Sequence, residues 1–317
     1  MSDARHLRLR VSDLPPTHSR SVSRHARGKR RREAVVGAAF ALPYAIFLIC
    51  FGIGPAIYAF LLSFHTPGKG LLSFGFTGYR TAIHDPYFAS SARNVVEFVV
   101  LLTPLMVIIV PLLALLLHAR RGRTVAGIRL IYFLPGAVSG SVVVLVWLFM
   151  LDPQASPFSP ILRLFGWHTL QDVIVRQNYL YIFALMFLWS AVGGWIVITY
   201  GALKNVPDEI VGAAKIDGCG KVALARYITL PMIRKTLALM AILVIAAASQ
   251  VYTEPTILNQ ITDGTAPWGL NQVSYHLAFG LGYFEASAAV AMMLVVFALA
   301  AAGIIVRKVG FFKAIDE

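Results

Sequence analysis

Residues that could carry out chemistry are sparse in this chain, and few of them lie within its long apolar stretches. The ionisable candidates in or near those stretches are Glu97 and Glu254, whereas a membrane-embedded hydrolase usually needs ionisable residues paired inside its spans. The eight histidines are scattered, and Cys50 in an apolar run and Cys219 in a polar loop form no disulfide framework or metal pair. We therefore predict no catalytic residues, no metal site and no cofactor bound by this chain.

Motifs for binding nucleotides are also missing. The sequence contains no G-x-x-x-x-G-K-[ST] loop and no G-x-G-x-x-G between a strand and a helix. It likewise lacks H-E-x-x-H and G-x-S-x-G, which would indicate a zinc protease or a serine hydrolase. The chain is predicted not to be an enzyme.

The most distinctive polar stretch is Pro207 to Pro231, which lies between two strongly apolar runs. Pro207 followed by Asp208 and Glu209 is typical of a helix start, because acidic side chains interact favourably with the positive end of the helix dipole. Gly218 and Gly220 allow a turn, and Pro231 is expected to end the second helical piece. We predict a compact helix-turn-helix that docks onto another protein.

The elements around this stretch are apolar enough to cross a membrane. The chain has 317 residues, 58% hydrophobic and 14% charged, with a mean hydropathy of +0.71. A soluble protein carries about 25% charged residues, and a span needs about 20 apolar ones. We predict an all-α polytopic membrane protein with six spans at about 34–62, 95–117, 128–151, 180–203, 237–258 and 286–306, and a polar loop at 204–235.

The distribution of basic residues predicts the topology. If the N-terminus is cytoplasmic, the inner segments hold 23 of the 28 Lys and Arg residues and the outer segments hold 5. The positive-inside rule then puts both termini and the polar loop in the cytoplasm. Residues 1–33 carry ten of these basic residues and are expected to form a disordered tail. A topology anchor, a lipid contact and a nucleic-acid contact are alternative roles for this tail.

The sequence from Leu42 to Val306 resembles the permease subunits of carbohydrate ABC importers, in particular the maltose/glycerol-3-phosphate branch. Gly212 to Gly218 (GAAKIDG) and Ile228 to Pro231 (ITLP) resemble the "EAA" loop of these permeases. Further resemblances are found at Leu42-Pro43, Phe76 to Arg80 (FTGYR), Asp85 to Phe88 (DPYF), Phe133 to Pro135 (FLP), Gln250 to Pro255 (QVYTEP) and Tyr275 to Phe279.

This resemblance implies a type I ABC-importer permease fold that translocates a sugar, or a related polyol or glycerol phosphate. It also implies a second homologous permease, two ATPase subunits that bind ATP and Mg²⁺, and an extracytoplasmic solute-binding protein. The cytoplasmic loop would be a coupling helix seated on the ATPase and moving as a rigid body with the spans beside it. The residues implied in this ATPase coupling are Glu209, Gly212, Ala213, Ala214, Asp217, Gly218 and Pro231.

One departure from the family pattern falls in this loop. Gly212 occupies the position of the glutamate in E-A-A. Glu209 lies one helical turn earlier and is a candidate to supply the missing charge. Alternatively, the partner permease carries the complete motif.

The family places its substrate contacts on the fourth and fifth spans. In this chain the implied substrate-pathway residues are Trp189, Ser190, Gly194, Gln250, Tyr252, Thr253 and Glu254. The fifth span supports this role with its unusually polar end, because Ala246 to Glu254 reads A-A-A-S-Q-V-Y-T-E. The alternative is helix packing, for which serine and glycine are often used in membranes.

Two other classes of function are alternatives for this sequence. An ion-gradient-driven secondary transporter would show inverted repeats and intramembrane charges, and neither is visible. A membrane enzyme or assembly factor would need a catalytic constellation, which the sequence lacks.

Overall fold

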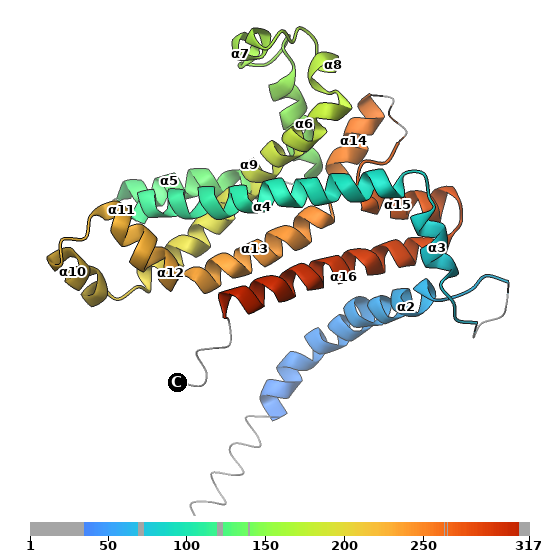
Figure 1. Ribbon diagram of the computed structural model, residues 1–317, viewed down its shortest axis with the longest axis horizontal. Coiled ribbons are helices and arrows are strands. Elements are labelled where there is room, and N and C mark those ends of the chain that lie inside the picture. The colour runs from blue at the N-terminus through green and yellow to red at the C-terminus, as the bar shows by residue number, and fades with distance from the viewer. Residues whose placement is uncertain are drawn as a thin grey trace, which may run out of the picture. The chain divides into compact units, whose positions relative to one another are not determined.

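The computed structural model describes residues 35–68, 73–118, 123–138, 140–262, 264 and 266–310 (Figure 1). These residues are helical apart from turns, loops and one isolated bridge between His65 and Phe74. The predicted all-α class is confirmed. The basic tail at 1–33 and the C-terminal residues 311–317 lie outside the described residues.

The chain divides into two compact units, residues 1–58 and 59–317. In the first unit a helix starts at Val35, and this candidate span runs to Ser63 in the second unit. The helix widens into a π-helical turn, η2 (Leu48–Ile53), before α2 (Gly54–Ser63). Pro55 explains the irregularity, because it has no N–H to give to an α-helical bond and its ring clashes with the preceding turn.

The second unit contains four further uninterrupted candidate spans and their connections. The candidate spans run from Phe88 to His118, Arg176 to Lys204, Arg234 to Ile261 and Phe284 to Val309. The helices of this unit are α3 (Thr77–Ile83), α4 (Phe88–His118), α5 (Arg123–Phe133), η3 (Leu134–Ala137), α6 (Gly140–Leu151), α7 (Ser159–Leu164), α8 (Leu170–Val173), η4 (Arg176–Asn178), α9 (Tyr179–Lys204), α10 (Asp208–Ile216), α11 (Lys221–Leu224), η5 (Ala225–Thr229), α12 (Leu230–Met232), α13 (Arg234–Ser249), α14 (Thr253–Ile261), α15 (Leu270–Tyr275), η6 (His276–Gly280) and α16 (Phe284–Val309).

The third span is not the straight helix that the sequence suggested. Residues Gly127–Ala137 and Gly140–Leu151 form two helical pieces bent by 103°. Pro135 lies at the bend in η3 and prevents a continuous α-helix there. The described residues thus hold five candidate spans, or six if this bent pair counts as one.

The fifth span is interrupted as well. Helix α13 ends at Ser249 and α14 begins at Thr253, so Gln250 to Tyr252 lie outside both helices. Pro255 accounts for the break, because its ring would clash with the carbonyl of Val251 in a continuous helix. The Gln250 carbonyl oxygen instead accepts a hydrogen bond from the Asn271 side-chain amide at 2.8 Å.

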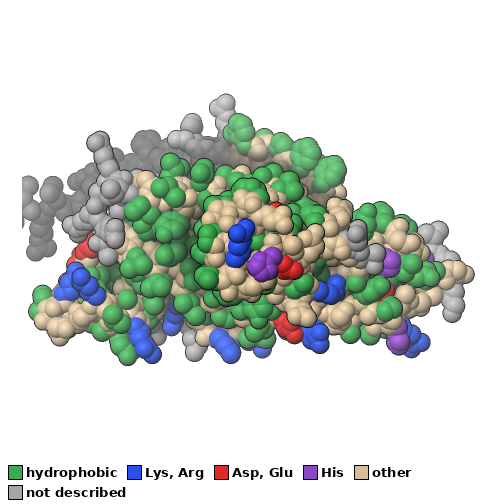
Figure 2. Space-filling view, turned by 90° about the horizontal axis from the view of Figure 1, so that it is seen from above, with side chains coloured by type: hydrophobic (Ala, Val, Ile, Leu, Met, Phe, Trp, Pro, Cys, Tyr) green, Lys and Arg blue, Asp and Glu red, His purple; other side chains and the backbone are tan. Residues whose placement is uncertain are grey.

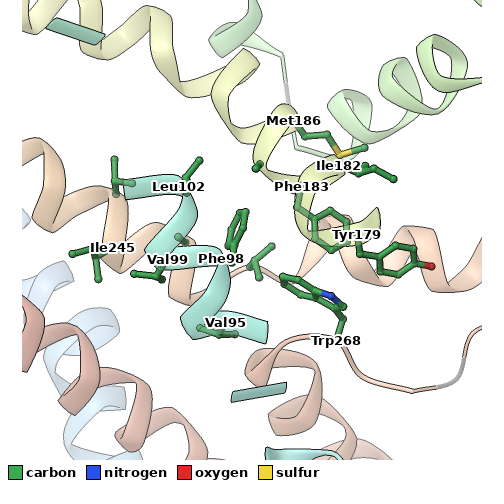
Figure 3. Packing of buried hydrophobic residues seen from close by; sticks show 14 of the residues in the cluster. Val95, Phe98, Val99, Leu102, Tyr179, Ile182, Phe183, Met186, Ile245 and Trp268 are labelled. Atoms are coloured by element: carbon green, nitrogen blue, oxygen red, sulfur yellow. The ribbon is translucent and has the colours of Figure 1, made fainter. Parts of the chain in front are cut away.

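The core is formed where α4 and α9 pack together and receive an aromatic side chain from the loop before α15. Figure 3 shows Phe98 and Phe183 facing the Trp268 indole, with ring centroids 5.9 and 4.8 Å from it. Trp268 is only 3% exposed, so it is a packing residue and not part of an interfacial aromatic belt. The Asn94 side-chain amide donates to the Trp268 carbonyl oxygen at 2.9 Å and fixes the loop against α4.

A glycine brings α5 and α9 close together. A Cβ atom at Gly193 would overlap the Tyr132 carbonyl oxygen, whereas one at Gly194 would meet no heavy atom within 4 Å. Small residues let helix backbones approach closely inside membranes. Gly193 is therefore required for packing, while its neighbour faces open space.

The outer surface suits a bilayer. Figure 2 shows hydrophobic side chains over much of one face, with most of the charged side chains along its lower edge. Large apolar residues such as Val100, Ile108, Val296 and Leu299 are exposed on α4 and α16. Lipid or a partner subunit can cover such residues without loss of stability.

Candidate functional site

The helix-turn-helix lies between α9 and α13 and consists of α10, α11, η5 and α12, here called the α10–α12 segment. Helix α10 begins at Asp208, directly after Pro207, and carries both acidic residues in its first turn. The helix ends at Ile216, and two residues later Gly218 adopts a φ of +80°. The Cys219 N–H then donates to the Ala214 carbonyl oxygen at 2.9 Å. The turn thus lies where the sequence predicted it, and glycine is the residue that suits its left-handed backbone.

The surface of this segment is unusually apolar for a connection between helices. The side chains of Ile216, Val222 and Tyr227 are 89%, 81% and 71% exposed. Exposed apolar side chains that gather on one small element favour a protein contact. Of the two alanines in the motif, Ala213 is exposed, whereas Ala214 is buried within the chain itself.

The second helical piece ends at Met232, one residue beyond Pro231, which the sequence predicted as its end. The π-helical turn η5 (Ala225–Thr229) leads directly into α12, in which Pro231 occupies one of the first positions. Proline is tolerated there because the first N–H groups of a helix need no helical partner. The α10–α12 segment therefore reaches α13 through nearly continuous helix.

Gly212 and Glu209 lie about one turn apart on α10. A Cβ atom at Gly212 would have no heavy atom within 4 Å, so a larger side chain would fit at this position without a steric clash. Glu209 is exposed on α10, one turn before Gly212. Both positions can present a side chain to a partner.

The predicted substrate-pathway residues of α9 lie together near the bent third span. Trp189 packs edge-to-face against Trp147 of α6, with ring centroids 6.1 Å apart. A Cβ atom at Gly136 of η3 would lie 2.9 Å from the Ser190 carbonyl oxygen. The Ser190 hydroxyl donates to the Met186 carbonyl oxygen at 3.0 Å, which is also how serine packs inside a helix. Gly194 adds open space one turn further along α9.

The residues predicted in the fifth span surround the break between α13 and α14. Tyr252 lies in the break, while Thr253 and Glu254 start α14 and are half-buried. Gln250 is exposed and contributes its carbonyl oxygen to Asn271. Among the described residues, no hydrogen bond or ring contact joins these residues to Trp189, Ser190 or Gly194.

Tyr252 also lines a pocket of about 290 Å³ at the end of the molecule opposite α10, here called the aromatic pocket (Figure 1). Its walls come from α14, the loop before α15, α15 itself and η6. The lining residues are Tyr252, Thr256, Asn259, Pro267, Gln272, Tyr275, His276, Phe279 and Gly280.

Aromatic rings form one side of this pocket. The rings of Tyr252 and Tyr275 have centroids 5.8 Å apart, and those of Tyr275 and Phe279 lie 4.9 Å apart. The residues that line the pocket include no Lys, Arg, Asp or Glu. Such a combination of aromatic faces and a few polar groups is typical of a small-molecule site.

The polar groups of the pocket also hold its shape. The Gln272 side-chain amide donates to the Thr256 hydroxyl at 3.2 Å, and its oxygen accepts from the Trp268 N–H at 2.8 Å. The Asn259 amide donates to the Ala266 carbonyl oxygen at 3.1 Å. These bonds leave the hydroxyls of Tyr252 and Tyr275 available, because neither has a hydrogen-bond partner among the described residues.

Sequence reasoning found Tyr252 but missed the other lining residues. The spacing of Tyr275 and Phe279 four residues apart was the signal that could have indicated a common helix face. This spacing could not show that the loop before α15 brings the helix face with Tyr275 and Phe279 close to the break in the fifth span.

No protein-family model matches the chain. It is 27% identical over 266 residues to a probable ABC transporter permease protein, PH1215, of Pyrococcus horikoshii, covering 82% of this chain and 90% of that protein. It is 28% identical over 312 residues to NgcF, a diacetylchitobiose uptake system permease of Streptomyces coelicolor, covering 91% and 88% respectively.

The fold has a counterpart among solved structures. A bacterial alginate ABC transporter, crystallised in complex with an alginate pentasaccharide-bound periplasmic protein, contains a chain that matches with a TM-score of 0.73. The match covers 87% of this chain and 94% of that one, at 19% identity. This likeness establishes the fold.

Proposed function

Because this chain is a permease of the carbohydrate ABC-importer family, we propose that it translocates a sugar delivered by an extracytoplasmic binding protein. It is a multi-pass membrane protein and a transport subunit, not an enzyme. The observation that carries the proposal is the α10–α12 segment, an exposed apolar helix-turn-helix between two spans of a chain without a nucleotide-binding motif.

We propose that this segment seats on an ATPase subunit. Ile216 and Val222 offer exposed apolar contact, while Glu209 offers a charge on α10, which also carries Gly212 and Ala213. Ala214, Asp217, Gly218 and Pro231 maintain the fold of the segment, through the turn or the entry into α12. ATP and Mg²⁺ bind to the ATPases, whose closure moves α10 together with α9 and α13.

The proposed assembly contains a second, homologous permease, two ATPases and the binding protein. Both termini and the α10–α12 segment face the cytoplasm, with residues 1–33 as a basic tail and residues 34–317 as the permease domain. The aromatic pocket, at the opposite end of the helices, then faces the binding protein.

We propose that the substrate is a neutral saccharide. The aromatic pocket presents ring faces and hydroxyl groups but no Lys, Arg, Asp or Glu side chain. A charged solute would lose its hydration there without gaining a partner of opposite charge. Tyr252 belongs to this pocket, and Trp189, Ser190, Gly194, Gln250, Thr253 and Glu254 are proposed to line the path further into the membrane.

The test is uptake into proteoliposomes that contain the complete complex and the binding protein. We expect uptake to require ATP inside the vesicle and to continue when the proton gradient is dissipated. Ile216→Glu should reduce uptake at least tenfold, because a carboxylate would be desolvated in the ATPase groove. Leu164→Glu is the matched control, since Leu164 is an exposed apolar residue on α7.

The alternative function is secondary transport driven by an ion gradient. Uptake that follows a proton gradient and ignores ATP would establish this alternative and refute the proposal. Replacing Gly218 with valine adds a second check on coupling. The positive φ strains any other side chain, so the ATPase should no longer co-purify with the complex.

A further inference from the structure

A cluster of basic side chains surrounds Tyr200 near the end of α9. The Arg129 guanidinium carbon lies 4.7 Å and the Lys204 ammonium nitrogen 5.3 Å from the centroid of the Tyr200 ring. The His118 ring packs edge-to-face on it, with centroids 5.9 Å apart. These residues come from three helices, because His118 ends α4, Arg129 lies in α5 and Lys204 ends α9.

The two cationic groups of the cluster lie over the same aromatic ring. Both distances end on one ring centroid, so the charge centres lie within about 10 Å of each other. That separation is comparable to the Debye length of about 8 Å at physiological ionic strength. The Tyr200 ring attracts both cations but carries no net charge. Among the described residues, no carboxylate forms an ion pair with Lys204 or His118.

The surroundings of the cluster are apolar on the membrane side. Leu116, Leu130, Ile131 and Ile198 lie on the same three helices as the cluster and are exposed. Tyr200 itself is only 8% exposed and belongs to the core. The site thus combines cationic side chains around Tyr200 with exposed apolar side chains on the same three helices.

We propose that Arg129, Lys204 and His118 bind the phosphate of an anionic phospholipid, whose acyl chains lie along the exposed residues of α4, α5 and α9. Tyr200 positions the two cations, because cation–π contacts hold them over one ring. The apolar side chains favour a lipid over free phosphate. Basic residues at the ends of spans bind anionic headgroups in this way. The proposal needs only that this end of the bundle meets a leaflet surface, so it stands independently of the transported solute.

The test measures phosphatidylglycerol retained by the purified full-length complex in native mass spectrometry. We expect Arg129→Gln/Lys204→Gln to retain this lipid about 30-fold more weakly, the effect of losing two basic residues at an anionic surface. Arg307→Gln/Lys308→Gln at the end of α16 removes the same charge elsewhere and should retain the lipid normally. The charge-conserving Arg129→Lys/Lys204→Arg complex should also retain it, which separates lost charge from misfolding.

A second measurement identifies the source of the phosphate. Complexes in nanodiscs of phosphatidylcholine, with or without phosphatidylglycerol, are heated in the presence or absence of millimolar inorganic phosphate. We expect phosphatidylglycerol alone to raise the unfolding temperature, and only when Arg129 and Lys204 are intact. Stabilisation by inorganic phosphate alone would overturn the lipid assignment. Equal lipid retention by all variants would also overturn the proposal. So would a glutamine variant that loses the ATPase while its lipid retention is unchanged.

Discussion

At the scale of single residues, Gly212 is where the α10–α12 segment departs from the E-A-A pattern of the permeases that it resembles. The position has room for a side chain, and glycine lowers the stability of a helix interior by about 1 kcal/mol. We expect Gly212→Glu to raise the unfolding temperature and to increase the amount of ATPase that co-purifies.

The matched control is Gly220→Glu, because Gly220 also has open space but precedes α11. It adds the same charge to the same segment without restoring the motif. If both variants, or neither, change ATPase retention, Gly212 is not the position at which an acidic residue contacts the ATPase.

Tyr275 and Phe279 carry the residue-scale prediction for the aromatic pocket. Each Ala substitution should raise the KM for uptake about 5- to 30-fold, because truncation of a contacting aromatic residue typically costs about 1–2 kcal/mol. Tyr181→Ala is the control, since Tyr181 is an exposed aromatic residue outside the pocket. An unchanged KM in both pocket variants would exclude the pocket from the sugar pathway.

At the scale of helices, neighbouring glycines on α9 should behave differently. Gly193→Ala places a Cβ atom on the Tyr132 carbonyl oxygen, and overpacking of this kind costs about 3 kcal/mol. Gly194→Ala meets open space and should gain up to about 1 kcal/mol from helix propensity. Thermal unfolding of the detergent-purified complexes compares the two, and equal effects would contradict the close approach of α5 and α9.

The helices also show what the sequence could and could not predict. Hydropathy located the apolar helices and the chemistry of glycine located the turn at Gly218, because both depend on local residues. The prolines at the bend (Pro135) and at the break (Pro255) were the sequence signals for an interrupted helix. Proline also occurs inside the continuous helix α4, so its presence alone does not predict an interruption. Its effect therefore depends on what packs beside it.

Contacts between residues far apart in the chain could not be predicted from the sequence. The bond from Asn94 to the Trp268 carbonyl joins residues 174 positions apart, and no periodicity encodes it. The same holds for Asn271 and the Gln250 carbonyl oxygen, which bring α15 to the break in the fifth span. The aromatic pocket likewise gathers residues from separate elements, and of its lining the sequence identified Tyr252 alone.

At the scale of the whole molecule, the proposed topology can be tested with a native cysteine. Cys219 is partly exposed in the α10–α12 segment, while Cys50 lies in a candidate span. In a Cys50→Ser background, a membrane-impermeant thiol reagent should label Cys219 in inside-out vesicles and not in intact cells.

A reporter at the other end provides the control. His168 is exposed near the start of α8, and His168→Cys in a chain without the native cysteines should be labelled in intact cells or spheroplasts. Labelling of both positions from the same side would refute the proposed orientation.

The interruption at Gln250 to Tyr252 has a mechanical consequence. Helix α13 is a rod about 24 Å long that continues from the α10–α12 segment at one end and stops at this interruption at the other. Beyond it, hydrogen bonds and buried aromatic packing fasten α14 and α15 to the core. We propose that the interruption acts as a hinge, at which a force applied through α10 would tilt α13 while the wall of the aromatic pocket stays in place.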